Sequence, residues 1–293
     1  MEPTAIQTLK EAITLFEEVG MPARNLAVRT RSEYKHDLED LADFLEHQHI
    51  HRLEQISLAH LVGFQAEMDR RHYQESTRRR KTIAIKSFFK FITRHGVISH
   101  NVASQLIPPR VTRHEPRYLS EEEYGRLLRA GSHHPRDAAI IELFLQTGMR
   151  LAELANLTLA DVELPRKISK EPEDVGEGRG RRKGGKIEKI PLNYKACKAL
   201  KNWLNERPAI GAGAMFISKF RNPLSKRAIQ YVMEKYLKEA RIVGASVHTL
   251  RHTMATHHAI QGTDAKTIQE TLGHASLVTT ELYISLAKKA HAL

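Results

Sequence analysis

One segment of the chain combines a histidine and an arginine in a way that suits phosphate chemistry. His248 and Arg251 are three residues apart, so on a helix they lie on one face. A guanidinium beside a titratable imidazole can bind a phosphate group and exchange a proton next to it. An ordinary surface helix shows the same pair more often, so this segment alone leaves both interpretations open.

A second arginine is placed unfavourably unless something compensates its charge. An apolar helical pattern ends at Gly148 and another begins directly afterwards, so Arg150 is expected near a helix N-terminus. The positive end of the helix dipole lies there and disfavours a cation. Either a bound anion or the carboxylate of Glu153, one turn later, would compensate the charge.

The last segment of this kind contains a histidine and a tyrosine. Gly273 is predicted to end one helix and Ser276 to cap the next, so that Tyr283 lies two turns into the second helix. His274 lies in the junction, nine residues before the tyrosine. A single helical tyrosine is most often a residue at the edge of a core, so its position alone does not assign chemistry.

The histidines do not form a metal-binding pattern, although the chain has 17 of them. His248 and His252 lack the intervening Glu of the zinc-protease motif, and no carboxylate or thiol occurs between Val247 and His258. The single cysteine, Cys197, excludes an intrachain disulfide and a cysteine-cluster zinc site, and we interpret it as a packing residue. We therefore expect neither a metal nor another cofactor.

Composition gives the broad class of the protein. The 293 residues are 41% hydrophobic, which is enough for two domains with cores and excludes disorder of the whole chain. No apolar run approaches the roughly 20 residues that cross a bilayer, and the N-terminus has no secretory signal. We therefore expect a cytoplasmic protein without membrane segments. A net charge of +12 favours a polyanionic partner, of which nucleic acid is the commonest.

The chain is predicted to divide near its middle. Residues 106–118 contain three prolines and no hydrophobic period, which is typical of an extended linker. Directly after them, Ser120 and Glu123 form a capping box that marks the start of a helix. We therefore predict an N-terminal domain over residues 1–105, a linker over 106–118 and a C-terminal domain over 119–293.

The N-terminal domain is predicted to be entirely helical. One helix, capped by Ser76 and ended by Gly96, has an apolar face and an opposite face that is basic. No acidic residue occurs from Ser76 to Phe91, so the basic face suits DNA phosphates, although a solvated charged face has the same pattern. The residues predicted to contact DNA are Arg78, Arg79, Lys86, Lys90 and Arg94.

The C-terminal domain is predicted to be mainly helical with one small β element. Residues 186–192 alternate polar and apolar side chains, and residues 176–185 are rich in glycine and arginine. We interpret these two stretches as a strand and the turn of a basic hairpin. The predicted fold class is therefore mainly α with a small sheet or hairpin in the C-terminal domain.

Taken together, the order and spacing of these segments resemble the tyrosine recombinase, or phage integrase, family. The motifs that carry the resemblance are Thr147-Gly-Met-Arg-Leu-Ala-Glu-Leu154, His248-Thr-Leu-Arg-His252 and Leu272-Gly-His-Ala-Ser-Leu-Val-Thr-Thr-Glu-Leu-Tyr283. The N-terminal helices resemble the family's core-binding domain and residues 119–293 its catalytic domain. In size the chain is most similar to Xer recombinases and to transposon and integron integrases. The resemblance implies a two-domain architecture that forms a clamp around DNA.

The resemblance also implies a role for each motif residue. By matching position, the nucleophile is Tyr283, the two phosphate ligands are Arg150 and Arg251, the proton acceptor is His248, a further hydrogen-bond donor is His274, and a supporting acid is Glu153. The hairpin lysine that protonates the leaving oxygen matches Lys183. Lys186 remains a competing assignment, because the segment before the hairpin is longer than in compact relatives.

The reaction that the resemblance implies is site-specific recombination of double-stranded DNA. The tyrosine attacks a phosphodiester and forms a 3′-phosphotyrosyl link, and strands then exchange through a Holliday junction without metal or ATP. The implied assembly is a homo- or hetero-tetramer on two sites, and both chromosome-dimer resolution and mobile-element integration or resolution fit it. The alternatives from other classes are a non-catalytic DNA-binding relative, a type IB topoisomerase and a histidine-based metallohydrolase.

Overall fold

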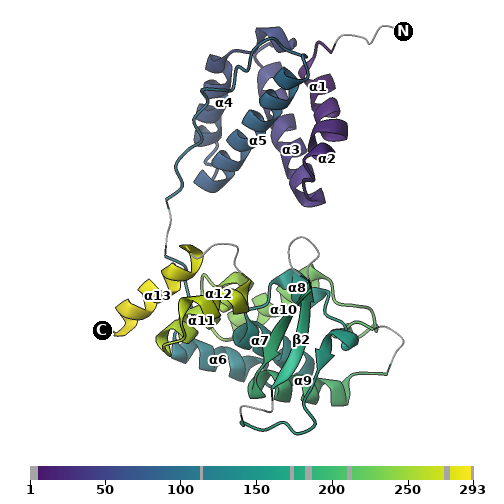
Figure 1. The fold of residues 1–293 in the computed structure, drawn as a ribbon, viewed down its shortest axis with the longest axis vertical. Helices are drawn as coiled ribbons and strands as arrows, with labels where there is room; N and C mark the ends of the chain where they lie inside the picture. The colour runs from purple at the N-terminus through teal and green to yellow at the C-terminus, as the bar shows by residue number, and fades with distance from the viewer. Residues whose placement is uncertain are drawn as a thin grey trace. The chain divides into compact units, whose positions relative to one another are not determined.

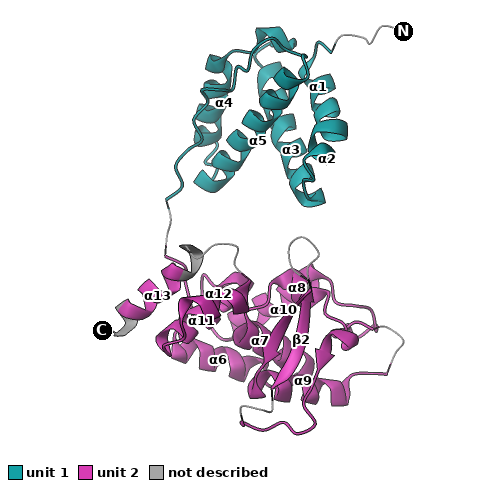
Figure 2. Ribbon diagram, viewed as in Figure 1, with its two compact units in different colours: residues 1–114 teal, residues 115–293 magenta. Residues whose placement is uncertain are grey.

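In the residues that the structure describes, the chain is mainly helical with one small antiparallel sheet, which confirms the predicted fold class. It forms two compact units, residues 1–114 and 115–293, and the division falls inside the segment 106–118 (Figure 2). The computed structural model describes residues 6–112, 115–171, 175–181, 187–209, 213–273 and 278–291, with the backbone alone at 181, 278–280 and 289–291.

Unit 1 is a helical bundle around a phenylalanine-rich core. Its elements are α1 (Leu9–Leu15), η1 (Phe16–Gly20), α2 (Met21–Ala23), α3 (Val28–Glu46), η2 (Leu53–Gln55), α4 (Leu58–Arg70) and α5 (Glu75–Arg94) (Figure 1). The helix α5 contributes Phe88 and Phe89 to this core, and both are fully buried. The Phe16 and Phe88 rings meet edge to face with 5.7 Å between their centroids, a favourable arrangement for two aromatic quadrupoles.

The helix α5 begins slightly earlier than its sequence pattern predicts. Ser76 was expected to be the cap, but the N-cap residue is Gln74, and Ser76 therefore lies in the first turn. The backbone of Gln74 is extended and turns directly into the helix, which brings the Glu75 carboxylate to the positive end of the helix dipole. The other end agrees with the prediction, because Gly96 follows the helix with a φ of +70°.

The start of the predicted linker and the residues just before it are held by side chains of unit 1. Lys86 in α5 donates hydrogen bonds to the carbonyl oxygens of Ala103, Ser104 and Leu106 at 3.2, 2.8 and 2.7 Å. The Gln65 amide donates to the Ile107 carbonyl oxygen at 2.9 Å. These bonds satisfy carbonyl groups that form no regular ladder, so this stretch is ordered by side chains of α4 and α5.

In unit 2, further helices and a three-stranded sheet pack around a central helix, α7. Its elements are α6 (Glu121–Gly131), α7 (Pro135–Thr147), α8 (Leu151–Ala155), η3 (Leu159–Asp161), β1 (Val162–Glu163), β2 (Gly176–Arg181), β3 (Ile187–Leu192), α9 (Tyr194–Glu206), α10 (Lys226–Glu239), α11 (Val247–Ile260), α12 (Ala265–Leu272) and α13 (Val278–His291). The predicted capping box of Ser120 and Glu123 is present at the start of α6.

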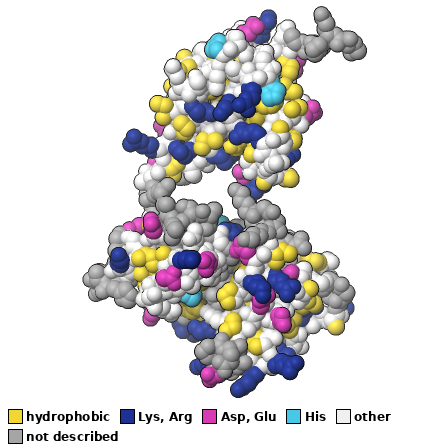
Figure 3. Space-filling view, in the orientation of Figure 1, with side chains coloured by type: hydrophobic (Ala, Val, Ile, Leu, Met, Phe, Trp, Pro, Cys, Tyr) yellow, Lys and Arg dark blue, Asp and Glu magenta, His cyan; other side chains and the backbone are white. Residues whose placement is uncertain are grey.

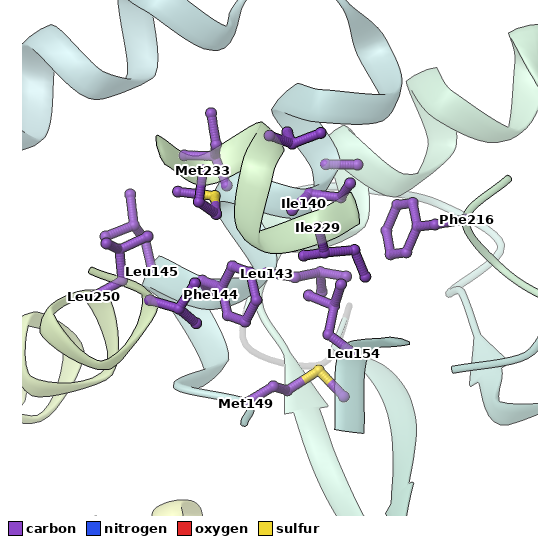
Figure 4. Close-up of a cluster of buried hydrophobic side chains, with 14 of the residues drawn as sticks. Ile140, Leu143, Phe144, Leu145, Met149, Leu154, Phe216, Ile229, Met233 and Leu250 are labelled. Carbon is purple, nitrogen blue, oxygen red and sulfur yellow. The ribbon is translucent and has the colours of Figure 1, made fainter. Parts of the chain in front are cut away.

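The core of unit 2 explains the apolar character of α7. Its side chains Leu143 and Phe144 are almost fully buried and lie among Ile229 and Met233 of α10 and Leu250 of α11 (Figure 4). A second cluster of buried apolar residues joins α11, α12 and α13. The three helices that carry the sequence motifs near the C-terminus are therefore packed together.

The sheet has the order β1-β2-β3, with both pairs antiparallel. Residues 176–185 were expected to be a turn, but 176–181 form the strand β2. Glycine permits this because a Cβ at Gly176 would lie 2.8 Å from the Cys197 sulfur and 3.0 Å from the Glu163 carbonyl oxygen. Cys197 itself is fully buried, which confirms it as a packing residue, and burial raises the pKa of its thiol. Among the described residues, no helix is long and apolar enough to span a bilayer.

Candidate active site

A tight turn between α7 and α8 places the first candidate residue. Gly148 ends α7 in the left-handed region with a φ of +61°, and a Cβ there would lie 2.6 Å from the Met254 side chain. The turn is therefore pressed against α11. It leaves Arg150 as the N-cap residue of α8, at the helix N-terminus that the sequence predicts.

Glu153 compensates the charge of Arg150. Its carboxylate accepts hydrogen bonds from the Arg150 backbone N–H at 2.8 Å and from Arg150 Nη1 at 2.7 Å. The Glu153 side chain is only 4% exposed, whereas that of Arg150 is 38% exposed. A guanidinium has five N–H groups, so Arg150 can make this ion pair and still bind an anion from its open side.

Arg251 is buried between the ends of two helices. Its Nη1 donates to the carbonyl oxygen of Gly148, at the end of α7, and its Nη2 donates to that of Leu272, at the end of α12, at 2.6 Å. Carbonyl groups at helix C-termini lack intrahelical partners and carry the negative end of the dipole. They therefore stabilise a buried cation and fix the plane of its guanidinium.

The two arginines converge on one turn of the chain. Arg150 Nη2 donates to the Gly273 carbonyl oxygen at 3.2 Å, and Arg251 binds the carbonyl oxygen of the residue before it. The side chains of Arg150 and Arg251, which are far apart in the sequence, are thus held by the carbonyl groups of two consecutive residues. This arrangement concentrates positive charge where one phosphate group could meet both guanidiniums.

Tyr283 lies in the apolar cluster beside this turn. The residue is 1% exposed, and its hydroxyl lies 2.8 Å from Nδ1 of His252. Burial raises the pKa of the Tyr283 phenol, and the positive charge of Arg251 acts in the opposite direction. The pKa of His252 is lowered, first by burial and then by the charges of His248 and Arg251.

His252 is the residue of this site that sequence reasoning did not select. In the sequence it ends the motif His248-Thr-Leu-Arg-His252, but the resemblance assigns it no role and its spacing excludes it as a metal ligand. The signal was present, because His252 is four residues from His248 and adjacent to Arg251. His248 itself lies in the first turn of α11 and is exposed.

The remaining candidates for the catalytic set lie outside the described residues. These are Lys183, its competitor Lys186, and His274. Among the residues that the structure describes, no group of three or more His, Cys, Asp or Glu side chains could hold a metal ion.

The basic face of α5 is partly neutralised by residues from other elements. The sequence indicated no acid near it, but Arg78 pairs with Asp69 of α4, and Lys81 pairs with Asp37 of α3 at 3.0 Å. Sequence inspection missed these partners because they come from elsewhere in the fold. Arg79 donates to the Pro109 carbonyl oxygen at 3.0 Å.

Other basic residues on α5 are open to solvent. Lys90 and Arg94 are exposed, as is Arg79 beside its carbonyl contact. Lysine and arginine side chains gather in a band across the face of unit 1 that is shown in Figure 3. The basic face of α5 therefore combines side chains that hold the fold with side chains that can meet a polyanion.

Comparisons with known proteins match both units. Residues 117–290 match the phage integrase family, and residues 13–96 match the phage integrase N-terminal SAM-like domain. The tyrosine recombinase XerC of Roseiflexus castenholzii is 30% identical over 290 residues, which cover 95% of this chain and 90% of the relative. The XerC of Natranaerobius thermophilus is 34% identical over 275 residues, with 89% of each chain covered.

Solved structures of similar fold include two Xer recombinases and a lambda integrase. The XerA recombinase is 27% identical, with a TM-score of 0.51 and coverage of 94% of this chain and 93% of that one. The XerH recombinase bound to a palindromic difH substrate is 21% identical, with a TM-score of 0.76 and coverage of 95% and 82%. A lambda integrase tetramer bound to a Holliday junction is 16% identical, with a TM-score of 0.75 and coverage of 96% and 78%.

Proposed function

The chain belongs to the phage integrase family and is a tyrosine site-specific recombinase of the Xer and integrase type, and from this premise we propose that Tyr283 is its nucleophile. The phenol oxygen attacks a DNA phosphorus atom, and a 3′-phosphotyrosyl bond replaces the bond to the 5′-oxygen. A 5′-hydroxyl of another strand later reverses this step. The phosphodiester energy is kept in the covalent link, so strand exchange requires no ATP.

The observation that carries the proposal is the convergence of Arg150 and Arg251 at one turn that adjoins the apolar cluster of Tyr283. The attacked phosphate gathers negative charge in the transition state, and preorganised guanidiniums stabilise that charge without reorganising. Arg251 is fixed by two helix ends, and Arg150 is fixed by Glu153. The burial of Tyr283 in the adjoining apolar cluster supports the proposal, because surroundings without water would protect the covalent link from hydrolysis.

Two proton transfers complete the proposed reaction. The phenol of a tyrosine has a pKa of about 10, so its proton must pass to a base as the oxygen attacks. The assignment of that role to His248 stays a prediction. The departing 5′-oxygen takes a proton from Lys183, with Lys186 as the alternative donor, and His274 donates a hydrogen bond to the phosphate.

The partner in this proposal is double-stranded DNA in the cytoplasm. The net charge of +12 and the exposed basic residues of α5 support phosphate contacts along a duplex. Joining two sites requires several active centres, and the lambda integrase neighbour is a tetramer on a Holliday junction. We infer the same order of assembly here, with both units of each chain binding DNA.

The proposal is tested by trapping the covalent intermediate. Nicked duplexes of random sequence, and then the DNA that flanks the protein's own gene, are incubated with the protein, denatured and examined for an adduct. Mass spectrometry should locate the adduct on Tyr283, and Tyr283→Phe should abolish it while DNA binding persists. The matched control is Tyr231→Phe, because Tyr231 is 70% exposed on α10. An adduct that persists in Tyr283→Phe would refute the assignment.

A further inference from the structure

The contact between His252 and Tyr283 joins two helices of the site. The distance from His252 Nδ1 to the Tyr283 hydroxyl oxygen is 2.8 Å, and the two rings lie 5.8 Å apart between centroids. His252 belongs to α11 and directly follows Arg251, whereas Tyr283 belongs to α13. The contact therefore connects the helix of the nucleophile to the helix of a phosphate ligand.

The chemistry of the two groups sets the direction of this hydrogen bond. Burial, together with the charges of His248 and Arg251, favours the neutral imidazole of His252, because each of them lowers its pKa from 6.5. Burial raises the pKa of the phenol from 10.0 and so keeps it protonated. The hydroxyl therefore donates its proton to Nδ1, and the imidazole carries its own proton on Nε2.

Full proton transfer across this bond is strongly disfavoured in the free protein. The ordinary pKa values of tyrosine and histidine already differ by more than three units, and burial widens this difference. The equilibrium in the free protein therefore favours the neutral hydrogen-bonded pair. His252 is consequently suited to hold the hydroxyl as a hydrogen-bond acceptor, and less suited to remove its proton.

We propose that His252 is a positioning residue that accepts the hydrogen bond of the Tyr283 hydroxyl and so keeps the phenol oxygen close to Arg251. This inference rests on the proposed role of Tyr283 as the nucleophile. A phenol can turn about two side-chain bonds, and each unproductive orientation slows attack. Apolar packing places the ring of Tyr283, and the bond from His252 selects where its oxygen points.

The test separates hydrogen-bond acceptance from proton removal. In His252→Asn, the amide oxygen is the same number of bonds from Cα as Nδ1, so it can accept the hydrogen bond but cannot take the proton. His252→Leu fills the space without an acceptor. The rate of covalent attachment is measured in a single turnover with saturating nicked DNA, alongside DNA affinity and the Tm of each variant.

We expect His252→Asn to react within about twofold of the wild type and His252→Leu to react about tenfold more slowly, with unchanged DNA affinity. If the Leu variant has a lowered Tm, His252→Ser replaces it, because the serine hydroxyl is one bond too short to make the contact. His258→Leu is the matched control. His258 is a half-buried histidine of the same helix whose Nδ1 contacts Thr263, so its loss should leave the rate unchanged.

Each other outcome has a definite meaning. An Asn variant as slow as the Leu variant would overturn the proposal and indicate that His252 must take the proton. A Leu variant as fast as the wild type would also overturn it. If the wild type formed no adduct on Tyr283 with its own DNA site, the proposed function would fail and this inference with it, whereas variant effects on a working wild type concern His252 alone.

Discussion

Replacing Glu153 with glutamine should destabilise unit 2 and loosen Arg150. The Glu153 carboxylate is 4% exposed and accepts two hydrogen bonds from Arg150, one of which caps α8. In Glu153→Gln one amide oxygen remains as an acceptor, and the negative charge is lost. The amide nitrogen of the new glutamine would face an N–H donor of Arg150, so these two groups could not form a hydrogen bond with each other.

The expected size follows from the exposure of the two partners. Breaking a fully buried ion pair costs about 3–5 kcal/mol. Arg150 is 38% exposed, so water can solvate its guanidinium after the change and reduce the loss. Losing an N-terminal capping bond costs about 1 kcal/mol. We therefore expect the free energy of unfolding of unit 2 to fall by about 2 kcal/mol.

Trp203 provides a probe for unit 2 alone. It is the single tryptophan of the chain and is 7% exposed on α9. Urea unfolding followed by its fluorescence should show a midpoint lowered by about 1 M, for an m-value of about 2 kcal/mol/M. The control is Glu122→Gln, which removes an ion pair with Arg126 from an 80% exposed glutamate and should cost at most about 0.5 kcal/mol. Equal midpoints for the two variants would refute the reasoning.

Three further predictions concern other parts of the molecule. Arg251→Lys should slow covalent attachment at least about tenfold, because an ammonium cannot bridge two helix-end carbonyls as a planar guanidinium does; a normal rate would contradict the bridging role. Burial lowers the pKa values of His252 and His258 in the folded protein. The unfolded chain therefore binds more protons than the folded protein below pH 6.5, and the free energy of unfolding should decrease as the pH falls through this range. Denaturation at several pH values should show a weaker decline when both are replaced by Asn. Lys86→Ala should speed amide hydrogen exchange over residues 103–107. Lys90→Ala should leave this exchange unchanged. It should instead reduce the slope of log DNA affinity against log salt concentration by about one unit.

Local sequence patterns were sufficient for the elements that position the site. Gly148 and Gly273 both adopt the left-handed conformation at helix ends, as glycine after an apolar helical pattern predicts. The capping box of Ser120 and Glu123 forms as predicted, and Arg150 lies at a helix N-terminus as predicted. These features depend on residues within one or two turns of each other, and such short-range interactions can be read from a linear sequence.

The partners of the buried polar groups were decided by the tertiary structure. The resemblance assigned Arg150 and Arg251 to one phosphate, but the sequence did not indicate that adjacent backbone carbonyl groups would hold both side chains. The spacing of His252 from His248 and Arg251 marked it as a candidate, but its contact with the Tyr283 hydroxyl arises only because α13 packs on α11. Backbone carbonyls carry no residue identity, so a pattern of side chains cannot predict which cation will bind them.

The basic helix α5 shows the same division between local and tertiary information. Its amphipathic pattern predicted a helix with one apolar and one basic face, and the apolar face is buried. The pattern could not distinguish Lys86, which holds three carbonyl oxygens, from Lys90, which is exposed. Periodicity determines which way a side chain points from its own helix. The partners of that side chain come from other segments of the chain, which only folding brings near. These partners decide whether a charged side chain stabilises the fold or remains available for DNA.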